Sequence, residues 1–285
     1  MRKSRFASCL LSIVLTGVAS FAAPSPALKL SYKTIRVPGA QATAVYGINN
    51  TGDMVGSYVD GSGTRHGFLL ANGKVTNIDD PSGSDTYCFG INKAGSIVGY
   101  YATADHNAQG FLYQKGTFTD ISPAGSNGSQ ALGINDLGQI NGNFGDASGG
   151  SHAFLYDGSH YTQIDVPGAT YTLGGSINNH GVMTLVWLDS EFDAESSLYD
   201  GTTFTTIDVP GEESSSAGGI DNHGDVVFSW ESTDDTYGGA LLKKGKFHNF
   251  HTGKRTFGYG INDKHVIVGA FTNKQGTLLG FKATY

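Results

Sequence analysis

The stretch Tyr46–Asp60 reads YGINNTGDMVGSYVD, and it returns as FGINKAGSIVGYYAT from Phe89 and as LGINDLGQINGNFGD from Leu132. Its core, Gly-Ile-Asn or a close variant, begins at six positions: Gly47, Gly90, Gly133, Ser176, Gly219 and Gly260. The successive spacings are 43, 43, 43, 43 and 41 residues. Because chance does not produce five near-equal spacings, the sequence indicates a tandem array of one structural unit.

Each unit contains four short apolar runs separated by turn signals. In the first unit the runs cover residues 42–49, 53–59, 65–71 and 75–79, and the turns NTGD, DGSGT and NGK lie between them. Gly beside Asn or Asp between apolar runs is typical of turns that join antiparallel strands. Four such strands every 40 to 45 residues predict a propeller blade.

The two ends of the chain indicate how the array closes. Residues 32–40, YKTIRVPGA, match residues 161–169, YTQIDVPGA, which form a fourth strand, and the chain ends with only three strands after residue 258. We therefore predict an all-β, six-bladed propeller of four-stranded blades over residues 32–285. The N-terminal strand completes the last blade and removes the exposed sheet edges, which an open β-solenoid, the alternative, would keep.

The N-terminus has the three parts of a secretory signal peptide. A basic MRKSR precedes the uncharged residues 6–21, and the small residues Ser20, Ala22 and Ala23 offer cleavage sites. This pattern predicts a signal peptide over 1–22 and a short tail over 23–31. The apolar run is too short to span a bilayer, so we expect a secreted or periplasmic protein with no membrane span after signal removal.

Charge and cysteine content exclude several classes of protein. The net charge is −7, and loss of Arg2, Lys3 and Arg5 with the signal lowers 18 basic residues to 15 against 25 acidic ones. Nucleic-acid binding needs a basic footprint, so this class is excluded. Cys9 leaves with the signal, so Cys88 can form neither an intrachain disulfide nor a Cys-based zinc site. Its equivalents are mostly small, which predicts a packing role, and we expect a monomer.

The third run of each early unit opens with a distinctive triplet. It is His152-Ala153-Phe154 in the third unit, with related triplets from His66 and Gln109. With the surrounding GINNTGDMVGSYVDGSGTRHGFLLANG, these residues resemble the HAF-repeat family of extracellular proteins over roughly residues 32–285. The resemblance implies secretion and a repeat architecture, but no established activity, so no catalytic residue is carried over. Units four to six drift from the triplet, which hints at a specialised sector.

One position, at the loop end of the second run, is aromatic in every unit. Its occupants are Tyr58, Tyr101, Phe144, Trp187, Trp230 and Phe271. Packing between blades is one interpretation. The other is a flat platform for sugar rings, above all at Trp187 and Trp230, where Leu185 and Phe228 replace an earlier Gly. Tyr58, Tyr101, Trp187 and Trp230 are therefore candidate binding residues.

Polar candidates lie on the neighbouring strand and loop. His66 and His152 are equivalent, and Glu195 takes their position in the fourth unit. These three are candidate binding residues that either hold a neighbouring loop or exchange protons with a ligand. Asp189, Glu191 and Asp193 alternate along the loop before Glu195, so they are candidate Ca²⁺ ligands; a solvated acidic rim is the alternative. No other cofactor is expected, and His180 and His223 are interpreted as turn residues.

The sequence contains no nucleophile elbow, phosphate-binding Gly loop or zinc motif, so no catalytic residue is named. We therefore predict a secreted, non-catalytic binding or scaffolding propeller whose ligand is a glycan or a protein. The alternative is a carbohydrate-active enzyme, a polysaccharide lyase or glycoside hydrolase, with its site on the loop face. That alternative requires His66, His152, Glu195 or the acidic loops to meet in one pocket.

Overall fold

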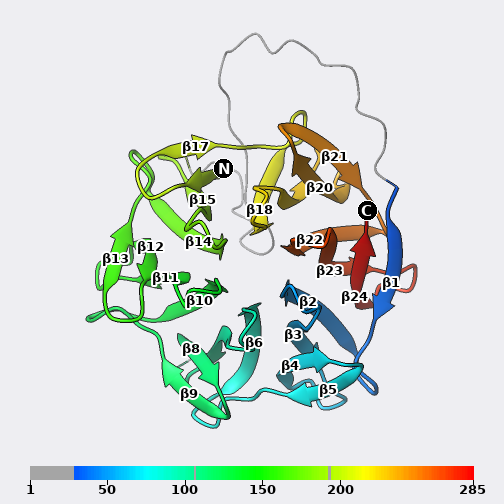
Figure 1. Cartoon of the computed structure of the whole chain (residues 1–285), viewed down its shortest axis with the longest axis horizontal. Coiled ribbons are helices and arrows are strands. Elements are labelled where there is room, and N and C mark those ends of the chain that lie inside the picture. Colours follow the sequence, from blue (N-terminus) through cyan, green and yellow to red (C-terminus); the bar gives the residue numbers. More distant parts are fainter. Residues whose placement is uncertain (1–28, 106, 192–193) are drawn as a thin grey trace, which may run out of the picture.

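The computed structural model describes residues 29–105, 107–191 and 194–285. Every regular element in these residues is a β-strand, and the strands surround a central axis (Figure 1). This confirms the predicted all-β propeller. The proposed signal peptide and residues 23–28 of the tail lie outside the described residues. Within the described ranges, no helix is long and apolar enough to cross a membrane.

Four sheets have four antiparallel strands each, in chain order from the axis outward (Figure 1). The first comprises β2 (Ala42–Ile48), β3 (Met54–Val59), β4 (Arg65–Ala71) and β5 (Lys74–Asn77). The second comprises β6 (Ser84–Ile91), β7 (Ile97–Ala102), β8 (Ala108–Gln114) and β9 (Thr117–Asp120). The third comprises β10 (Ser129–Ile134), β11 (Ile140–Gly145), β12 (Ser151–Tyr156) and β13 (Tyr161–Ile164). The fourth comprises β14 (Tyr171–Ile177), β15 (Met183–Leu188), β16 (Ala194–Tyr199) and β17 (Phe204–Thr206).

The remaining strands form one eight-stranded sheet with two halves. One half comprises β18 (Ser214–Ile220), β19 (Val226–Glu231), β20 (Tyr237–Lys243) and β21 (Lys246–Phe250). The other comprises β22 (Arg255–Asn262), β23 (Val266–Thr272), β24 (Leu278–Thr284) and β1 (Ser31–Ile35). A single parallel bridge between Tyr237 and Arg255 joins the halves, where the guanidinium lies 4.2 Å from the centre of the tyrosine ring. Hydrogen bonding therefore gives five sheets where we predicted six separate blades.

The N-terminal strand closes the ring. β1 pairs antiparallel with β24, from Ser31 opposite Thr284 to Ile35 opposite Gly280, and the two strands lie side by side in Figure 1. At the inner end of the same junction, Asn262 Nδ2 donates a hydrogen bond to the Asn49 carbonyl at 2.8 Å. The first and last units are thus in contact, as the predicted closure requires and an open solenoid does not.

The glycine and isoleucine of the repeated motif have separate structural tasks. Each inner strand has a β-bulge just before or within the motif. At Gly47, a Cβ atom would stand 2.3 Å from the Phe89 carbonyl oxygen of the next inner strand, so only glycine permits this approach. The following residue, Ile48 in the first unit, is buried in the interface with the neighbouring sheet. Adjacent sheets therefore meet closely at the axis.

The third residue of the motif forms a ring around one end of the central channel, which we call the asparagine ring. Its members are Asn49, Asn92, Asn135, Asn178, Asp221 and Asn262. Each asparagine Oδ1 accepts a backbone N–H of its own turn. Each Nδ2 donates to the main-chain carbonyl of the next member at 2.8–3.2 Å. The motif repeats because every unit must present the same donor and acceptor to its neighbour.

Some sequence differences in the later units keep the total side-chain volume at the interface between sheets unchanged. In the first sheet the fully buried Phe68 lies opposite Gly56, and Cβ at Gly56 would stand 3.0 Å from the phenyl ring. The β14–β17 sheet instead pairs Leu185 with Ser197. The β18–β21 half pairs Phe228 with Ala240. In these two units the large side chain stands on the second strand instead of the third, and a small residue takes the place of the phenylalanine. The replacement of glycine by Leu185 and Phe228 therefore keeps the packing and does not by itself mark a specialised sector.

Candidate functional site

The residues singled out by sequence lie at the far end of the strands from the asparagine ring. We call this end of the propeller the loop face. In every unit the aromatic position stands directly across from the first triplet position. The pairs are Tyr58–His66, Tyr101–Gln109, Phe144–His152, Trp187–Glu195, Trp230–Gly238 and Phe271–Leu279. The repeat therefore offers six equivalent positions with different chemistry.

In the first and third sheets the histidine is held between two aspartates. His66 Nδ1 lies 3.0 Å from Asp79 Oδ2 and Nε2 lies 3.4 Å from Asp60 Oδ2, while the Tyr58 ring stacks on the imidazole at 5.0 Å. His152 has the same arrangement, 2.8 Å from Asp165 and 3.4 Å from Asp146. Burial alone would lower the pKa of each histidine, but hydrogen bonds and charges of the aspartates outweigh it and raise the pKa. Both imidazoles are therefore engaged within their own sheet.

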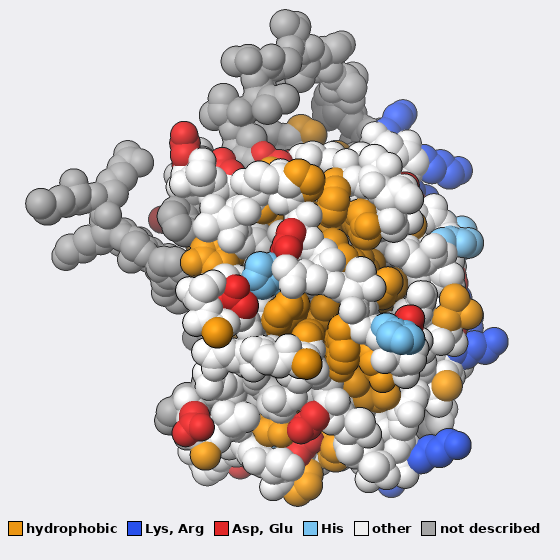
Figure 2. All heavy atoms as spheres, turned by 90° about the vertical axis from the view of Figure 1, so that its left-hand side faces the viewer, with side chains coloured by type: hydrophobic (Ala, Val, Ile, Leu, Met, Phe, Trp, Pro, Cys, Tyr) orange, Lys and Arg blue, Asp and Glu red, His pale blue; other side chains and the backbone are white. Residues whose placement is uncertain are grey.

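The acidic residues of these loops also have local partners. Asp60 Oδ1 accepts hydrogen bonds from the Ser62 hydroxyl at 2.7 Å, the Ser62 N–H at 2.8 Å and the Thr64 N–H at 3.0 Å. The Ser62 hydroxyl is the largest cause that lowers the pKa of Asp60 to about 2. On the side of the ring around β13, Figure 2 shows acidic and histidine side chains scattered beside a band of hydrophobic ones. Acidic side chains such as Asp60 and Asp146 thus accept hydrogen bonds from the backbone of their own loops.

The β14–β17 sheet breaks this pattern because Glu195 replaces the histidine. Asp189 and Asp208 occupy the positions of Asp60 and Asp79, so three carboxyl groups stand where the first sheet has two and an imidazole. Glu195 is only 8% exposed. Its burial, and then the charges of Asp208 and Asp189, raise its pKa to about 7. Across from it lies Trp187, partly exposed, whose Nε1–H donates to the Ser197 hydroxyl at 3.0 Å.

Two of the predicted aromatic platforms are packed into the protein. Tyr101 and Trp230 are 5% and 6% exposed. The Trp230 ring meets His251 edge-to-face at 5.0 Å, and its Nε1–H donates to the Gly239 carbonyl at 3.1 Å. The packing interpretation therefore describes both residues. Of the four candidates, Tyr58 and Trp187 are the two that stay partly exposed, although each also packs in part against a hydrophobic core.

The remaining sequence candidates do not converge. His66, His152 and Glu195 lie on β4, β12 and β16, in three different sheets. Among the predicted Ca²⁺ ligands, Asp189 Oδ1 accepts the Glu191 N–H at 2.8 Å, and Asp193 lies outside the described residues. The structure thus brings Trp187, Glu195, Asp189 and Asp208 into one neighbourhood and leaves the histidines apart.

The central channel is a feature that sequence reasoning missed. A cavity of about 350 Å³ lies between the inner strands. The Tyr46 ring stacks on Phe89 at 4.5 Å and lies 5.2 Å from Tyr259, whereas Gly175 and Gly218 take the equivalent positions in two other units. The residue just before each motif lines this cavity, but its identity changes from aromatic to glycine between units, so the sequence alone does not suggest a shared site.

Comparison with known proteins supports the fold. No protein-family model matches the sequence, and no curated protein sequence matches it significantly. Among solved structures, the SapL1 lectin bound to α-methyl fucoside has a TM-score of 0.58 at 11% identity, over 86% of this chain and 94% of the lectin. The six-bladed lectin of Aleuria aurantia has a TM-score of 0.53 at 12% identity, over 88% and 93%. TolB from Acinetobacter baumannii has a TM-score of 0.58 at 11% identity, over 82% of this chain and 64% of TolB.

Proposed function

We propose that this chain is a secreted, non-catalytic carbohydrate-binding propeller whose sugar site lies on the loop face of the β14–β17 sheet. The observation that carries the proposal is the pairing of a partly exposed indole, Trp187, with the carboxyl group of Glu195 directly across the sheet. The other three sheets with a polar residue at this position have His66, Gln109 or His152 there, and none of them combines an indole with a carboxyl group.

The chemistry of the pair suits a sugar. The apolar face of a pyranose ring packs against an aromatic surface, and its hydroxyl groups donate hydrogen bonds to carboxylate oxygens. Trp187 supplies the first contact, and Glu195 with Asp208 supplies the second. Ligand sites commonly join an apolar wall to a few placed polar groups in this way.

The fold supports the proposal at a coarser level. Propellers of similar shape include lectins that bind fucosides, and one of them is six-bladed. If each half of the eight-stranded sheet counts as one blade, the ring of this chain also has six blades. The resemblance to HAF-repeat extracellular proteins and the N-terminal signal pattern support secretion, and a secreted propeller meets glycans at cell surfaces.

A carbohydrate-active enzyme is the second candidate because one observation favours it. A carboxyl group with a pKa near 7 suits a general acid, and Glu195 has this property. However, His66 and His152 stand in other sheets, so proton exchange would fall to the three carboxyl groups alone. Binding without turnover is therefore the stronger proposal.

The test is a thermal-unfolding and calorimetry screen of the purified chain against methyl fucosides, other monosaccharides and soluble polysaccharides. A ligand at a hundredfold excess over its Kd stabilises the native state by about 2.7 kcal/mol. We expect one sugar class to raise the melting temperature, and Trp187→Ala to abolish the effect. Tyr58→Ala, the equivalent change in the first sheet, is the matched control and should preserve binding.

Chromatography of the incubated polysaccharides separates the two candidates, because only an enzyme releases shorter products. If no sugar raises the melting temperature, or if Trp187→Ala binds like the unchanged chain, the proposed sugar site is wrong.

A further inference from the structure

The asparagine ring has one irregular member, Asp221. The other five members each donate a side-chain N–H to the next carbonyl, but a carboxyl group in its charged form has no proton to donate. The ring therefore lacks the bond from Asp221 to Asn262 that its five equivalents make. The Asp221 side chain is 0% exposed, and a buried charge is costly unless it is compensated. Asparagine would serve the ring better, so ring closure does not explain this carboxylate.

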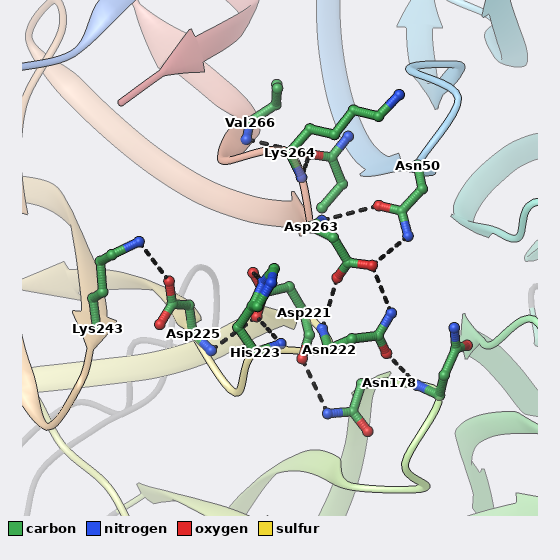
Figure 3. A network of polar contacts seen from close by, with 12 residues as sticks. Asn50, Asn178, Asp221, Asn222, His223, Asp225, Lys243, Asp263, Lys264 and Val266 are labelled. Atoms are coloured by element: carbon green, nitrogen blue, oxygen red, sulfur yellow. Dashed lines mark hydrogen bonds and ion pairs between the residues drawn. The ribbon is translucent and has the colours of Figure 1, made fainter.

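A second carboxylate and an imidazole stand beside it (Figure 3). One ligand atom each from Asp221, His223 and Asp263 lies within 4.8 Å of the other two. Asp221 Oδ2 is 3.2 Å from His223 Nδ1, and its Oδ1 accepts the N–H groups of His223 and Asp225 at 2.9 Å, as ring members do in their own turns. Residues 221 and 263 belong to successive units, so the packing of one unit against the next brings the three together.

The second carboxylate is held in place by its neighbours. Asp263 Oδ2 accepts hydrogen bonds from the side-chain amides of Asn50 at 2.6 Å and Asn222 at 2.7 Å, and its Oδ1 accepts the Asn222 N–H at 2.8 Å. Oδ1 therefore keeps one lone pair for an ion, whereas both lone pairs of Oδ2 are already engaged. Hydrogen-bond partners of this kind orient the side chains that bind a metal ion. The nearby Asp225 is already paired with Lys243 at 3.0 Å, so it is neutralised separately.

We propose that Asp221, His223 and Asp263 bind a divalent transition metal ion of the Zn²⁺ class at the end of the channel opposite the sugar site. Two carboxylates and one imidazole suit such an ion, whereas Ca²⁺ prefers oxygen ligands throughout. The ion would neutralise both carboxylates. His223 is 56% exposed, so it gives the ion access from solvent.

The distances permit this with small movements. Zinc bonds of about 2.0–2.2 Å place tetrahedral ligand atoms about 3.3 Å apart. The exposed imidazole of His223 can close the gap by rotation, while water completes the coordination. A further nitrogen is near: the His265 ring lies 5.8 Å from that of His223, and in the described part of the chain its buried Nδ1 has no hydrogen-bond partner.

The experiment is zinc titration of the metal-stripped purified chain, followed by calorimetry, by unfolding with and without chelator, and by the absorption bands of Co²⁺ as a substitute ion. We expect one Zn²⁺ per chain and a higher melting temperature. Asp221→Asn restores the ring donor, so it should abolish zinc binding and raise the metal-free melting temperature by about 2–4 °C. Asn222→Ala should weaken zinc binding about 10–100-fold.

His223→Ala should also abolish zinc binding without unfolding the chain, because the side chain is exposed. The matched control is His160→Ala, an exposed turn histidine whose Nδ1 lies 3.8 Å from a single aspartate, Asp157, and it should bind zinc normally. The proposal is overturned if the unchanged chain takes up no stoichiometric zinc. It is also overturned if the Asp221 and His223 variants bind zinc as tightly as the unchanged chain.

Discussion

Replacing Asn135 by alanine tests whether the asparagine ring holds the propeller together. The Asn135 side chain makes four hydrogen bonds. Nδ2 donates to the Asn178 carbonyl at 3.0 Å and to Gln139 Oε1 at 2.7 Å, and Oδ1 accepts the N–H groups of Leu137 at 3.1 Å and Gln139 at 3.0 Å. The change removes all four at a buried position.

The magnitude follows from these contacts. A hydrogen bond contributes about 1 kcal/mol to the free energy of unfolding, and a buried group left without a partner costs about 1–3 kcal/mol. Leu137 is 72% exposed, so its N–H regains a bond to water, and the carbonyl of Asn178 keeps the Gly181 N–H at 3.1 Å. The other three bonds of Asn135 are lost without replacement at a buried position. We expect Asn135→Ala to lower the free energy of unfolding by about 2–4 kcal/mol.

The assay is urea unfolding followed by tryptophan fluorescence, with the slope m checked for constancy. Leu137→Ala, in the same turn but exposed, is the control and should change the free energy by less than about 0.5 kcal/mol. A loss below about 1 kcal/mol for Asn135→Ala, or one equal to the control, would refute the structural role assigned to the ring.

Three further outcomes are expected. The pKa of Glu195 is raised by burial, Asp208 and Asp189 to about 7, so the folded state holds its proton more tightly and loses stability as pH rises from about 4.5 through 7. Glu195→Gln should therefore raise the free energy of unfolding above pH 8, by up to about 3 kcal/mol at about 1.4 kcal/mol per pKa unit, and change it little below pH 4.5, as read by urea unfolding at each pH. A gain independent of pH would contradict this. Gly99→Ala should prevent folding, because Cβ would stand 1.8 Å from the Tyr87 carbonyl oxygen, whereas Gly61→Ala, with open space around it, should fold normally by circular dichroism. Cys88 is fully buried, which raises its pKa, so iodoacetamide should label it only after denaturation, as read by peptide mapping; labelling of the native chain would disprove the packing role.

The sequence by itself determined the repeat, the strand count in each unit and the closure by the N-terminal strand. These follow from a local pattern, because turn residues and alternating apolar runs act within about 40 residues. It also placed Cys88 in the core, since the equivalent positions hold small residues. The sequence did not predict that two units join into one sheet, because the single bridge between Tyr237 and Arg255 leaves no repeated signal in the residues.

Which candidates share a site was decided only by the tertiary structure. Trp187 and Trp230 are equivalent in sequence, yet one ring is partly exposed and the other is covered by His251. In the sequence His223 has the character of a turn residue, and only the packing of the next unit places Asp263 beside Asp221 and His223. The reason is physical: exposure and charge at one position depend on side chains of the neighbouring sheet, and their identity is not written in the unit itself.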